Sequence, residues 1–302
     1  MEKKILFFLK YLAAILIIVY ILKKIDLSKV FVLLKDINYF WLGLDLLVYL
    51  MAVIITSYGL KVLFDSIVKI RFLEWMKYFL ITFSIGLIIP GKLGEFSIIY
   101  FLRKKNVDIG ASTALTVINK LITVIIFGIV ALIGFFLIFS SNDLIIALVL
   151  GLLFVLGVLF LFSKLGRIFV KKMIGDLFKQ VDIFYTTFDN LCKKNKDKLL
   201  VSAIVTLLRP MFNGLIILLS FKAIGVDVSL MYAILVNALT IIASLVPITP
   251  NGLGIREGIG VFLFRNIGIP LEVSVTMYFI IFVMNSLTGI IGVVYYFLEK
   301  RN

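Results

Sequence analysis

The sequence contains no histidine and only one cysteine, Cys192. A disulfide within the chain is therefore impossible, and the imidazole and thiolate ligands of ordinary metal sites are missing. The chain also has no phosphate-binding loop of the G-x-x-x-x-G-K-[ST] type, so nucleotide hydrolysis is not expected to drive its activity. We expect no metal and no other cofactor.

Apolar residues, by contrast, are abundant. They make up 62% of the 302 residues, and the mean hydropathy is +1.16. Soluble domains contain about 45–50% apolar residues, so the composition indicates an integral membrane protein. The apolar runs are long and uninterrupted, which predicts helices rather than the alternating strands of a barrel. The expected fold class is all-α, in a polytopic integral membrane protein.

Six apolar runs have about the length that a helix needs to cross a bilayer. They cover residues 5–22, 39–60, 113–139, 143–163, 199–221 and 271–298. The first run is too long for the apolar part of a secretory signal and has no small-residue cleavage pattern after it, so we expect it to remain as a transmembrane helix. Two further apolar regions, 78–102 and 229–266, are interrupted in the middle by proline and glycine.

Lysine and arginine set the predicted orientation, because they concentrate in cytoplasmic loops. The connection at 140–143 has neither residue, whereas 164–198 is densely basic, so the first is predicted outside and the second inside. With six crossings, region 78–102 then begins and ends at the cytoplasmic face, and region 229–266 at the external face. Each region is predicted to be a re-entrant helical hairpin, and both chain termini are predicted to be cytoplasmic.

The segment 23–38 conflicts with this orientation, because it carries four lysines and falls on the external side. Its apolar positions have helical spacing, at Val30, Leu33, Leu34 and Ile37. Such a pattern is typical of an amphipathic helix that lies at the membrane interface.

The two halves of the chain have the same order of predicted elements, inverted relative to each other: two spans, a hairpin and a third span. Transporters are often built as inverted repeats, with broken helices near the midplane that form the site. We therefore expect residues 1–302 to form a single transmembrane domain, with repeat 1 at about 1–139 and repeat 2 at about 143–302.

A weak sequence match supports the repeat. A shift of 160 residues places three pairs together: Pro90 on Pro250, Leu93 on Leu253 and Gly94 on Gly254. After an insertion of two residues, Glu95 falls on Glu257.

The interrupting segments read PGKLGEF at 90–96 and PNGLGIREGIG at 250–260. Proline disrupts the incoming helix, and glycine allows a tight turn and the close approach of another backbone or a ligand. The residues expected at the hairpin tips are Pro90, Gly91, Gly94, Pro250, Gly252 and Gly254. A helix that starts after each turn would direct its free N–H groups at the tip, which suits a phosphate group.

Inserting an ionisable side chain into the membrane costs about 2.5–3.5 kcal/mol of free energy on insertion scales, so such residues indicate a functional role. The candidate substrate-binding residues are Lys92, Glu95, Lys120, Arg209, Arg256 and Glu257. Arg209 adjoins a helix-breaking proline in mid-span, with Asn213 one turn further on. No catalytic or metal-binding residue is expected.

Structural explanations for these polar residues stay open. Each Lys/Glu or Arg/Glu couple could simply be an ion pair that holds its hairpin. Lys120 lies close enough to the end of its span to extend its ammonium toward the interface. Asn237 and Asn285 are expected to be hydrogen-bond partners between helices rather than ligand contacts.

The order of the motifs PGKLGEF, FLRKK, TALTVINKL and PITPNGLGIREG resembles the transmembrane-region family of lysylphosphatidylglycerol synthases over nearly the whole chain. The resemblance implies a flippase-like domain that moves a modified phospholipid between leaflets. The chain stops at Asn302 without the soluble domain that makes the lipid, so synthase activity is not expected.

The resemblance also marks individual positions of the two tip motifs. These are Pro90, Gly91, Lys92, Gly94 and Glu95 in the first, and Pro250, Gly252, Gly254 and Glu257 in the second. Where many relatives have Glu-Arg in the next span, this chain has Asn119-Lys120, so a role that needs that carboxylate is not implied here.

The leading hypothesis is a lipid translocator, a flippase or scramblase, for an anionic phospholipid or a polyprenyl-phosphate-linked lipid. The tip amides, together with Lys92, Arg209 and Arg256, would hold the head group, and transport would be passive or coupled to protons through Glu95 or Glu257. Two alternatives stay open: an accessory membrane protein of a lipid or glycan assembly pathway, and an intramembrane polyprenyl-pyrophosphate phosphatase. Under the leading hypothesis the protein is not an enzyme.

The expected partners are membrane lipids with anionic or phosphate-bearing head groups, and a homo-oligomer is left open. The net charge of +14 does not indicate nucleic-acid binding, because the positive residues fall mostly between apolar spans. With no targeting or retention signal in the sequence, the expected location is the plasma membrane of a prokaryote.

Overall fold

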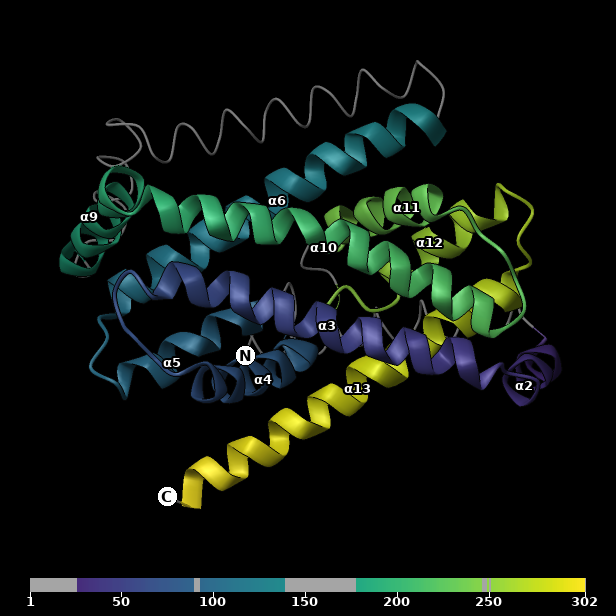
Figure 1. Ribbon diagram of the computed structural model, residues 1–302, viewed down its shortest axis with the longest axis horizontal. Helices are drawn as coiled ribbons and strands as arrows, with labels where there is room; N and C mark the ends of the chain where they lie inside the picture. The colour runs from purple at the N-terminus through teal and green to yellow at the C-terminus, as the bar shows by residue number, and fades with distance from the viewer. Residues whose placement is uncertain (1–25, 90–92, 139–177, 246–248, 250, 302) are drawn as a thin grey trace, which may run out of the picture.

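The computed structural model describes residues 26–89, 93–138, 178–245, 249 and 251–301. This part of the chain contains ten α-helices and one short 3₁₀ helix, η1, which confirms the all-α prediction for the described residues (Figure 1). In chain order the elements are α2 (Leu27–Lys35), α3 (Tyr39–Phe64), α4 (Phe72–Ile88), η1 (Leu93–Ser97), α5 (Ile98–Arg103), α6 (Ile109–Ile138), α9 (Phe178–Lys194), α10 (Lys196–Ala223), α11 (Leu230–Ala243), α12 (Ile255–Arg265) and α13 (Leu271–Arg301).

Four helices, α3, α6, α10 and α13, are long and apolar enough to cross a membrane. The shortest, α3, has 26 residues, or about 39 Å at 1.5 Å per residue, against about 30 Å of hydrocarbon. Large apolar side chains are exposed on all four, including Ile129, Leu207 and Leu287. So much exposed apolar surface is expected of a protein that faces lipid, and the chain is a multi-pass membrane protein.

These four helices coincide with the predicted spans 39–60, 113–139, 199–221 and 271–298 to within a few residues. The other two predicted spans, 5–22 and 143–163, lie outside the described residues. Four predicted tip or site residues lie outside them as well: Pro90, Gly91, Lys92 and Pro250.

Helices α3 and α10 form an antiparallel pair (Figure 1). At one end of the pair, the Asn38 N–H before α3 donates a hydrogen bond to the Ala223 carbonyl at the end of α10, at 2.8 Å. At the other end, the Lys198 ammonium near the start of α10 donates to the Asp65 carbonyl after α3. These contacts define two ends of the helical bundle.

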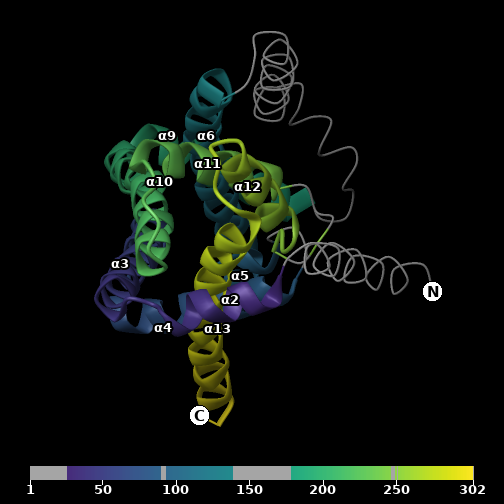
Figure 2. The same ribbon diagram turned by 90° about the vertical axis from the view of Figure 1, so that its right-hand side faces the viewer.

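The end that contains Asp65 also holds the start of α4, the end of α5 and the C-terminal part of α13. Lys105 after α5 pairs with Glu74 in the first turn of α4 at 2.6 Å, and Lys77 of α4 pairs with Glu299 of α13. We call it the basic end, because the loops between α3 and α4 and between α5 and α6 are rich in lysine and arginine. The C-terminal part of α13 projects away from the other helices, toward the bottom of Figure 2.

The opposite end holds α2 and the starts of α11 and α13. The Asp26 side chain caps α2 by accepting the Ser28 N–H at 3.0 Å, and the Asp26 N–H lies 3.5 Å from the Glu272 carboxylate of α13. On α2, Phe31 and Val32 are exposed, whereas Leu33, Leu34 and the following Ile37 pack against the core. The segment 23–38 is thus helical over its described part, with the predicted apolar face turned inward.

The first interrupted region reverses direction after α4. Ile89 is extended, with φ −77° and ψ 128°, as expected for a residue that precedes a proline. The chain then returns through η1 and α5 to the basic end. On this return Gly94 lies so close to α4 that a Cβ atom on it would be 2.4 Å from the Gly86 Cα. The two glycines therefore allow direct contact between the backbones.

The second interrupted region also reverses direction, between α11 and α12. Helix α11 ends at Ala243, the chain turns through Gly252 at φ +74°, and α12 leads away. A Cβ atom on Gly252 would be 2.4 Å from the Ser244 Cβ, just after α11. The Tyr232 hydroxyl near the start of α11 donates to the Leu263 carbonyl near the end of α12, at 2.7 Å. This second turn also brings its outgoing helix back beside the incoming one.

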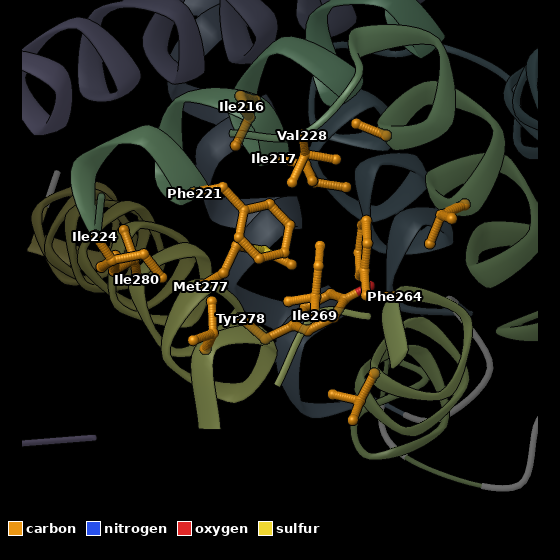
Figure 3. Packing of buried hydrophobic residues seen from close by; sticks show 14 of the residues in the cluster. Ile216, Ile217, Phe221, Ile224, Val228, Phe264, Ile269, Met277, Tyr278 and Ile280 are labelled. Carbon is orange, nitrogen blue, oxygen red and sulfur yellow. The ribbon is translucent and has the colours of Figure 1, made fainter. Parts of the chain in front are cut away.

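The apolar core has a large cluster toward each end of the bundle. The cluster at the opposite end centres on α10, α12 and α13, where the rings of Phe221 and Phe264 meet edge to face, 4.9 Å apart (Figure 3). The cluster at the basic end includes Phe64 of α3 and Trp75 of α4, with ring centroids 5.2 Å apart. A polar cavity lies between these clusters, bordered by Leu60 of the second and Ile217 of the first.

Candidate functional site

The cavity has a volume of about 240 Å³ and is lined by residues of α3, α4, α6, α10, α11, α12 and α13. The two interrupted regions both contribute to its wall: Glu95 comes from the first, and Asn251 and Arg256 come from the second. Segments about 160 residues apart in the chain therefore meet at one central polar space.

Glu95 and Lys120 form an ion pair on the cavity wall. The Lys120 ammonium on α6 donates to the Glu95 carboxylate on η1 at 2.7 Å, and their side chains are 22% and 42% exposed. This contact fixes η1 against α6. Because both groups border the cavity, the pair also neutralises the carboxylate at that point.

Arg209 projects from α10 into the same space. Its Nη1 donates to the Thr123 hydroxyl of α6 at 3.0 Å, and its guanidinium lies 5.8 Å from the centre of the Phe127 ring. A guanidinium has five N–H donors, and within the described part of the chain only this one makes a hydrogen bond. The neighbouring Pro210 is buried inside the helix and supplies no N–H to the ladder.

Arg256 lies in the first turn of α12, on the cavity wall. Its Nε is buried and has no hydrogen-bond partner among the described residues. Buried polar atoms in native proteins are nearly always paired with protein, water or ligand. This donor is therefore available to a group that enters the cavity.

Glu257 has a different environment from the other candidates. Its carboxylate accepts the Gly254 N–H at 2.6 Å, at the start of α12. This is the glutamate half of a capping box, with glycine as the N-cap residue at φ +85°. The contact holds the start of α12 in place, and the side chain is not among the residues that line the cavity.

The charges on the cavity wall are unequal. Lys120, Arg209 and Arg256 are positive and Glu95 is negative, which leaves two positive charges in excess among the described lining residues. Charges in a site shielded from bulk water act more strongly than on a surface. Arginine also suits the geometry of phosphate oxygens, which it can bind through two parallel hydrogen bonds. The cavity can therefore hold an anion such as a phosphate group.

The structure thus brings together four of the six predicted substrate-binding residues: Glu95, Lys120, Arg209 and Arg256. It places Glu257 at a helix cap, and Lys92 lies outside the described residues. In the described ranges, no group of three His, Cys, Asp or Glu side chains could hold a metal ion.

Several polar side chains on the wall lie on one face of α6. They are Thr116, Asn119, Lys120 and Thr123, at the spacing of neighbours on a helix face. Sequence reasoning noticed the Asn119-Lys120 pair but missed Thr123, the partner of Arg209. The helical repeat of polar residues within an otherwise apolar span is a signal that could have found it.

Asn237 and Asn285 both line the cavity but differ in their bonding. Asn285 accepts the Tyr49 hydroxyl at 3.2 Å and donates to the Ile281 carbonyl at 2.9 Å, as expected of a partner between helices. The Asn237 Oδ1 is buried and has no partner among the described residues. Within the described ranges, Asn237 therefore does not make the helix-to-helix hydrogen bond that the sequence suggested.

A comparison of the sequence with curated proteins finds no match. A comparison with protein families finds the Lysylphosphatidylglycerol synthase TM region, which matches residues 7–292. The match covers nearly the whole chain, including both interrupted regions, the whole of α3, α6 and α10, and most of α13. The polar cavity is thus a feature of a membrane domain, and the chain belongs to the family of the lysylphosphatidylglycerol synthase transmembrane region.

Proposed function

We propose that this protein translocates a phosphate-bearing lipid between membrane leaflets, as a flippase or scramblase and not as an enzyme. The observation that carries the proposal is the central cavity, where three cationic side chains and one paired carboxylate meet at the junction of the two interrupted regions. Family membership is consistent with it, because this family is associated with lipid modification and translocation.

We interpret the two interrupted regions as re-entrant hairpins in an inverted repeat. The first region starts with α4 and finishes with α5, both at the basic end. The second starts with α11 and finishes with α12, both at the opposite end. Helix α4 packs on α13, and the Ser84 hydroxyl of α4 donates to the Gly289 carbonyl at 2.7 Å. Helix α11 packs on α6. The first helix of each hairpin therefore packs on the last span of the other half, as a two-fold relation requires.

The proposed domain has six spans, with the remaining two at 5–22 and 143–163. The basic end is assigned to the cytoplasm, because lysine and arginine concentrate in cytoplasmic loops. Both termini are then cytoplasmic, and the proposed location is a prokaryotic plasma membrane. In this orientation the two hairpins would enter from opposite faces and meet at the cavity near the midplane, as in transporters built from inverted repeats.

In the proposed mechanism the head group of the lipid enters the cavity while its tails remain in the bilayer. The phosphate would be held by Arg209 and Arg256, which both have N–H donors without a partner among the described residues. A phosphate group that crosses the hydrocarbon alone would lose its hydration. The arginines lower this cost by replacing water with fixed hydrogen-bond donors.

The test is movement of fluorescent phosphatidylglycerol and polyprenyl-phosphate lipids across the membrane of proteoliposomes. We expect wild type to move at least one probe. Arg209→Gln or Arg256→Gln should slow this movement about tenfold or more, because each removes one charged hydrogen bond to the phosphate. Arg103→Gln is the matched control, because Arg103 is exposed at the basic end. It should leave the rate unchanged.

Two other results would overturn the proposal. Release of inorganic phosphate from polyprenyl pyrophosphate in the same vesicles would identify a phosphatase. No movement of any probe by folded wild-type protein would favour an accessory protein in a lipid or glycan assembly pathway.

A further inference from the structure

Four asparagine side chains on the cavity wall make no hydrogen bond within the described part of the chain. They are Asn119 on α6, Asn213 on α10, Asn237 on α11 and Asn251 before α12. They come from four separate segments that the fold brings to one space. Asn285, on the same wall, is already bonded to Tyr49 and Ile281. Asn285 shows that an asparagine on this wall can be satisfied within the fold, so the other four have donors and acceptors to spare for a ligand.

Asn237 shows most clearly that these amides need an explanation. It is only 4% exposed, and its Oδ1 is buried with no partner in the described ranges. An amide buried in this way is costly unless something completes its hydrogen bonds. The Arg256 Nε on the same wall is also buried without a partner. Together these atoms indicate a ligand that accepts from an arginine and donates to an amide oxygen.

The chemistry of such a ligand follows from the donors and acceptors. An asparagine amide has two N–H donors and an acceptor oxygen. A hydroxyl group both donates and accepts, so it can bond to either side of an amide. An arginine matches a phosphate instead, which only accepts when ionised. One cavity that contains both suits a molecule with a phosphate and several hydroxyl groups.

An amine-bearing head group fits this wall less well. Glu95 is the only acidic side chain among the described lining residues, and Lys120 already pairs with it at 2.7 Å. A ligand ammonium would have to displace Lys120 and would be repelled by Arg209 and Arg256. The positive wall therefore selects against a second positive charge on the head group.

We infer that the cavity recognises an uncharged, hydroxyl-rich head group joined through a phosphate, with the arginines on the phosphate and the four free asparagines on the hydroxyls. As a statement about a lipid this rests on the proposed function. The shared chemistry is that of a glycerol or a sugar attached to a phosphate.

The test is calorimetric binding of soluble head groups to the full chain in detergent. The probes are glycerophosphoinositol, glycerophosphoglycerol, glycerophosphoethanolamine and inorganic phosphate. We expect at least one of the first two to bind tenfold or more tightly than the last two. Stronger binding of glycerophosphoinositol would point to a ring polyol or sugar, and stronger binding of glycerophosphoglycerol to a glycerol head group. This series uses only wild-type protein, so it does not depend on whether any variant folds.

Variants then assign the selectivity to the asparagines. Asn213→Leu and Asn237→Leu are close in volume to the original, and each should weaken binding of the polyol phosphates about tenfold while leaving inorganic phosphate unchanged. Arg209→Gln should weaken the binding of every phosphate-containing probe, inorganic phosphate included. Asn266→Ala is the control, because Asn266 is exposed at the end of α12, away from the cavity wall. It should change nothing.

Equal binding of inorganic phosphate and the polyol phosphates, preference for the ethanolamine compound, or no polyol binding at millimolar concentration would each overturn the inference. The vesicle assay separates the two proposals. Selective binding without lipid movement would leave the head-group inference standing and reject translocation. Lipid movement without head-group selectivity would do the reverse.

Discussion

Glu95 and Glu257 occupy matching positions in the two interrupted regions, yet the structure gives them different partners. Glu95 lies on η1 and bonds to a side chain from a distant span, Lys120, on the wall of the cavity. Glu257 bonds to the backbone of Gly254, the N-cap residue of its own helix, three residues before it. The two glutamates thus differ in role, although each lies in a proline- and glycine-interrupted segment.

The spacing of glycine and glutamate also differs between the two regions, by two residues. Glu95 directly follows Gly94 on the 3₁₀ helix η1, whereas Glu257 is the third residue of α12, where its carboxylate reaches back to the Gly254 N–H. Arg256, one residue earlier, then faces the cavity. The first region contributes a carboxylate to the cavity wall and the second contributes a guanidinium. The sequence match between the two segments therefore does not imply equivalent roles.

The largest expected effects come from the glycines at which each region folds back. In Gly94→Ala the new Cβ would lie 2.4 Å from the Gly86 Cα and 2.6 Å from the Gly86 N, both backbone atoms. In Gly252→Ala it would lie 2.4 Å from the Ser244 Cβ, with φ at +74°. Overpacking costs about 1–3 kcal/mol and a left-handed backbone about 1–2 kcal/mol. Both variants should melt several degrees lower in detergent.

A second substitution sharpens this comparison. Ser244→Gly removes the atom that Gly252→Ala meets first, so the double variant should recover part of the lost stability. No side chain can be removed to relieve Gly94→Ala, because its contacts are with backbone. Gly43→Ala is the control, since apart from its own stretch of the α3 backbone nothing lies within 4 Å of its new Cβ. It should be neutral or about 0.5–1 kcal/mol more stable, and an equal loss there would contradict the explanation.

The next effect concerns the two glutamates themselves. Glu95→Gln removes the negative charge that Lys120 compensates, so the cavity becomes more positive and should bind inorganic phosphate about tenfold more tightly, or about 1.4 kcal/mol. Glu257→Gln should leave phosphate binding unchanged, because glutamine can still accept the Gly254 N–H. Calorimetry on the two purified variants makes the measurement. Equal changes in both would show that the glutamates are equivalent after all.

The sequence allowed the helices of this molecule to be predicted more fully than its site. Long apolar runs identified α3, α6, α10 and α13, because burial in hydrocarbon imposes a minimum length. Proline and glycine located both reversals, since they act on the local backbone. Arg209 stood out because an ionised group within an apolar run is costly. Each of these signals is local in the chain.

The remaining features of the site depend on contacts between distant segments. The residues next to Asn237 in the sequence do not indicate that its amide oxygen lacks a partner among the described residues, because that depends on which segments pack against α11. The same holds for Thr123, which gains its role from Arg209 of another helix. The capping role of Glu257 is a partial exception, because a glutamate three residues after an N-cap is a local pattern, although glycine is a less usual first member.

A smaller contrast lies where each interrupted region begins and ends, which we call its open end. At the second, the Tyr232 hydroxyl donates to the Leu263 carbonyl at 2.7 Å, and this contact involves no charge. Tyr232→Phe should therefore destabilise the protein by about 0.5–1.5 kcal/mol, the value of one hydrogen bond. The loss should be the same at pH 4 and pH 8 in thermal melts, and a pH-dependent loss would contradict a neutral contact.

Where the first region begins and ends, the corresponding contact is the ion pair between Glu74 and Lys105, at 2.6 Å, with side chains 37% and 44% exposed. The hydrogen bond from the Lys105 ammonium lowers the pKa of the Glu74 carboxyl below its usual value. A lowered pKa in the folded state stabilises the protein above the unfolded pKa of about 4.3. This contribution is lost as the pH falls through the folded pKa.

The pair is exposed, so its contribution is small, about 0–1 kcal/mol. The difference in melting temperature between wild type and Glu74→Gln should be largest near pH 6, shrink toward pH 3, and shrink also in high salt because exposed charges are screened. Tyr232→Phe, measured in the same buffers, should keep a constant difference from wild type. If both variants respond alike to acid and salt, the two open ends are not stabilised by different kinds of interaction. The difference between an ion pair at one and a neutral hydrogen bond at the other would then have no effect on stability.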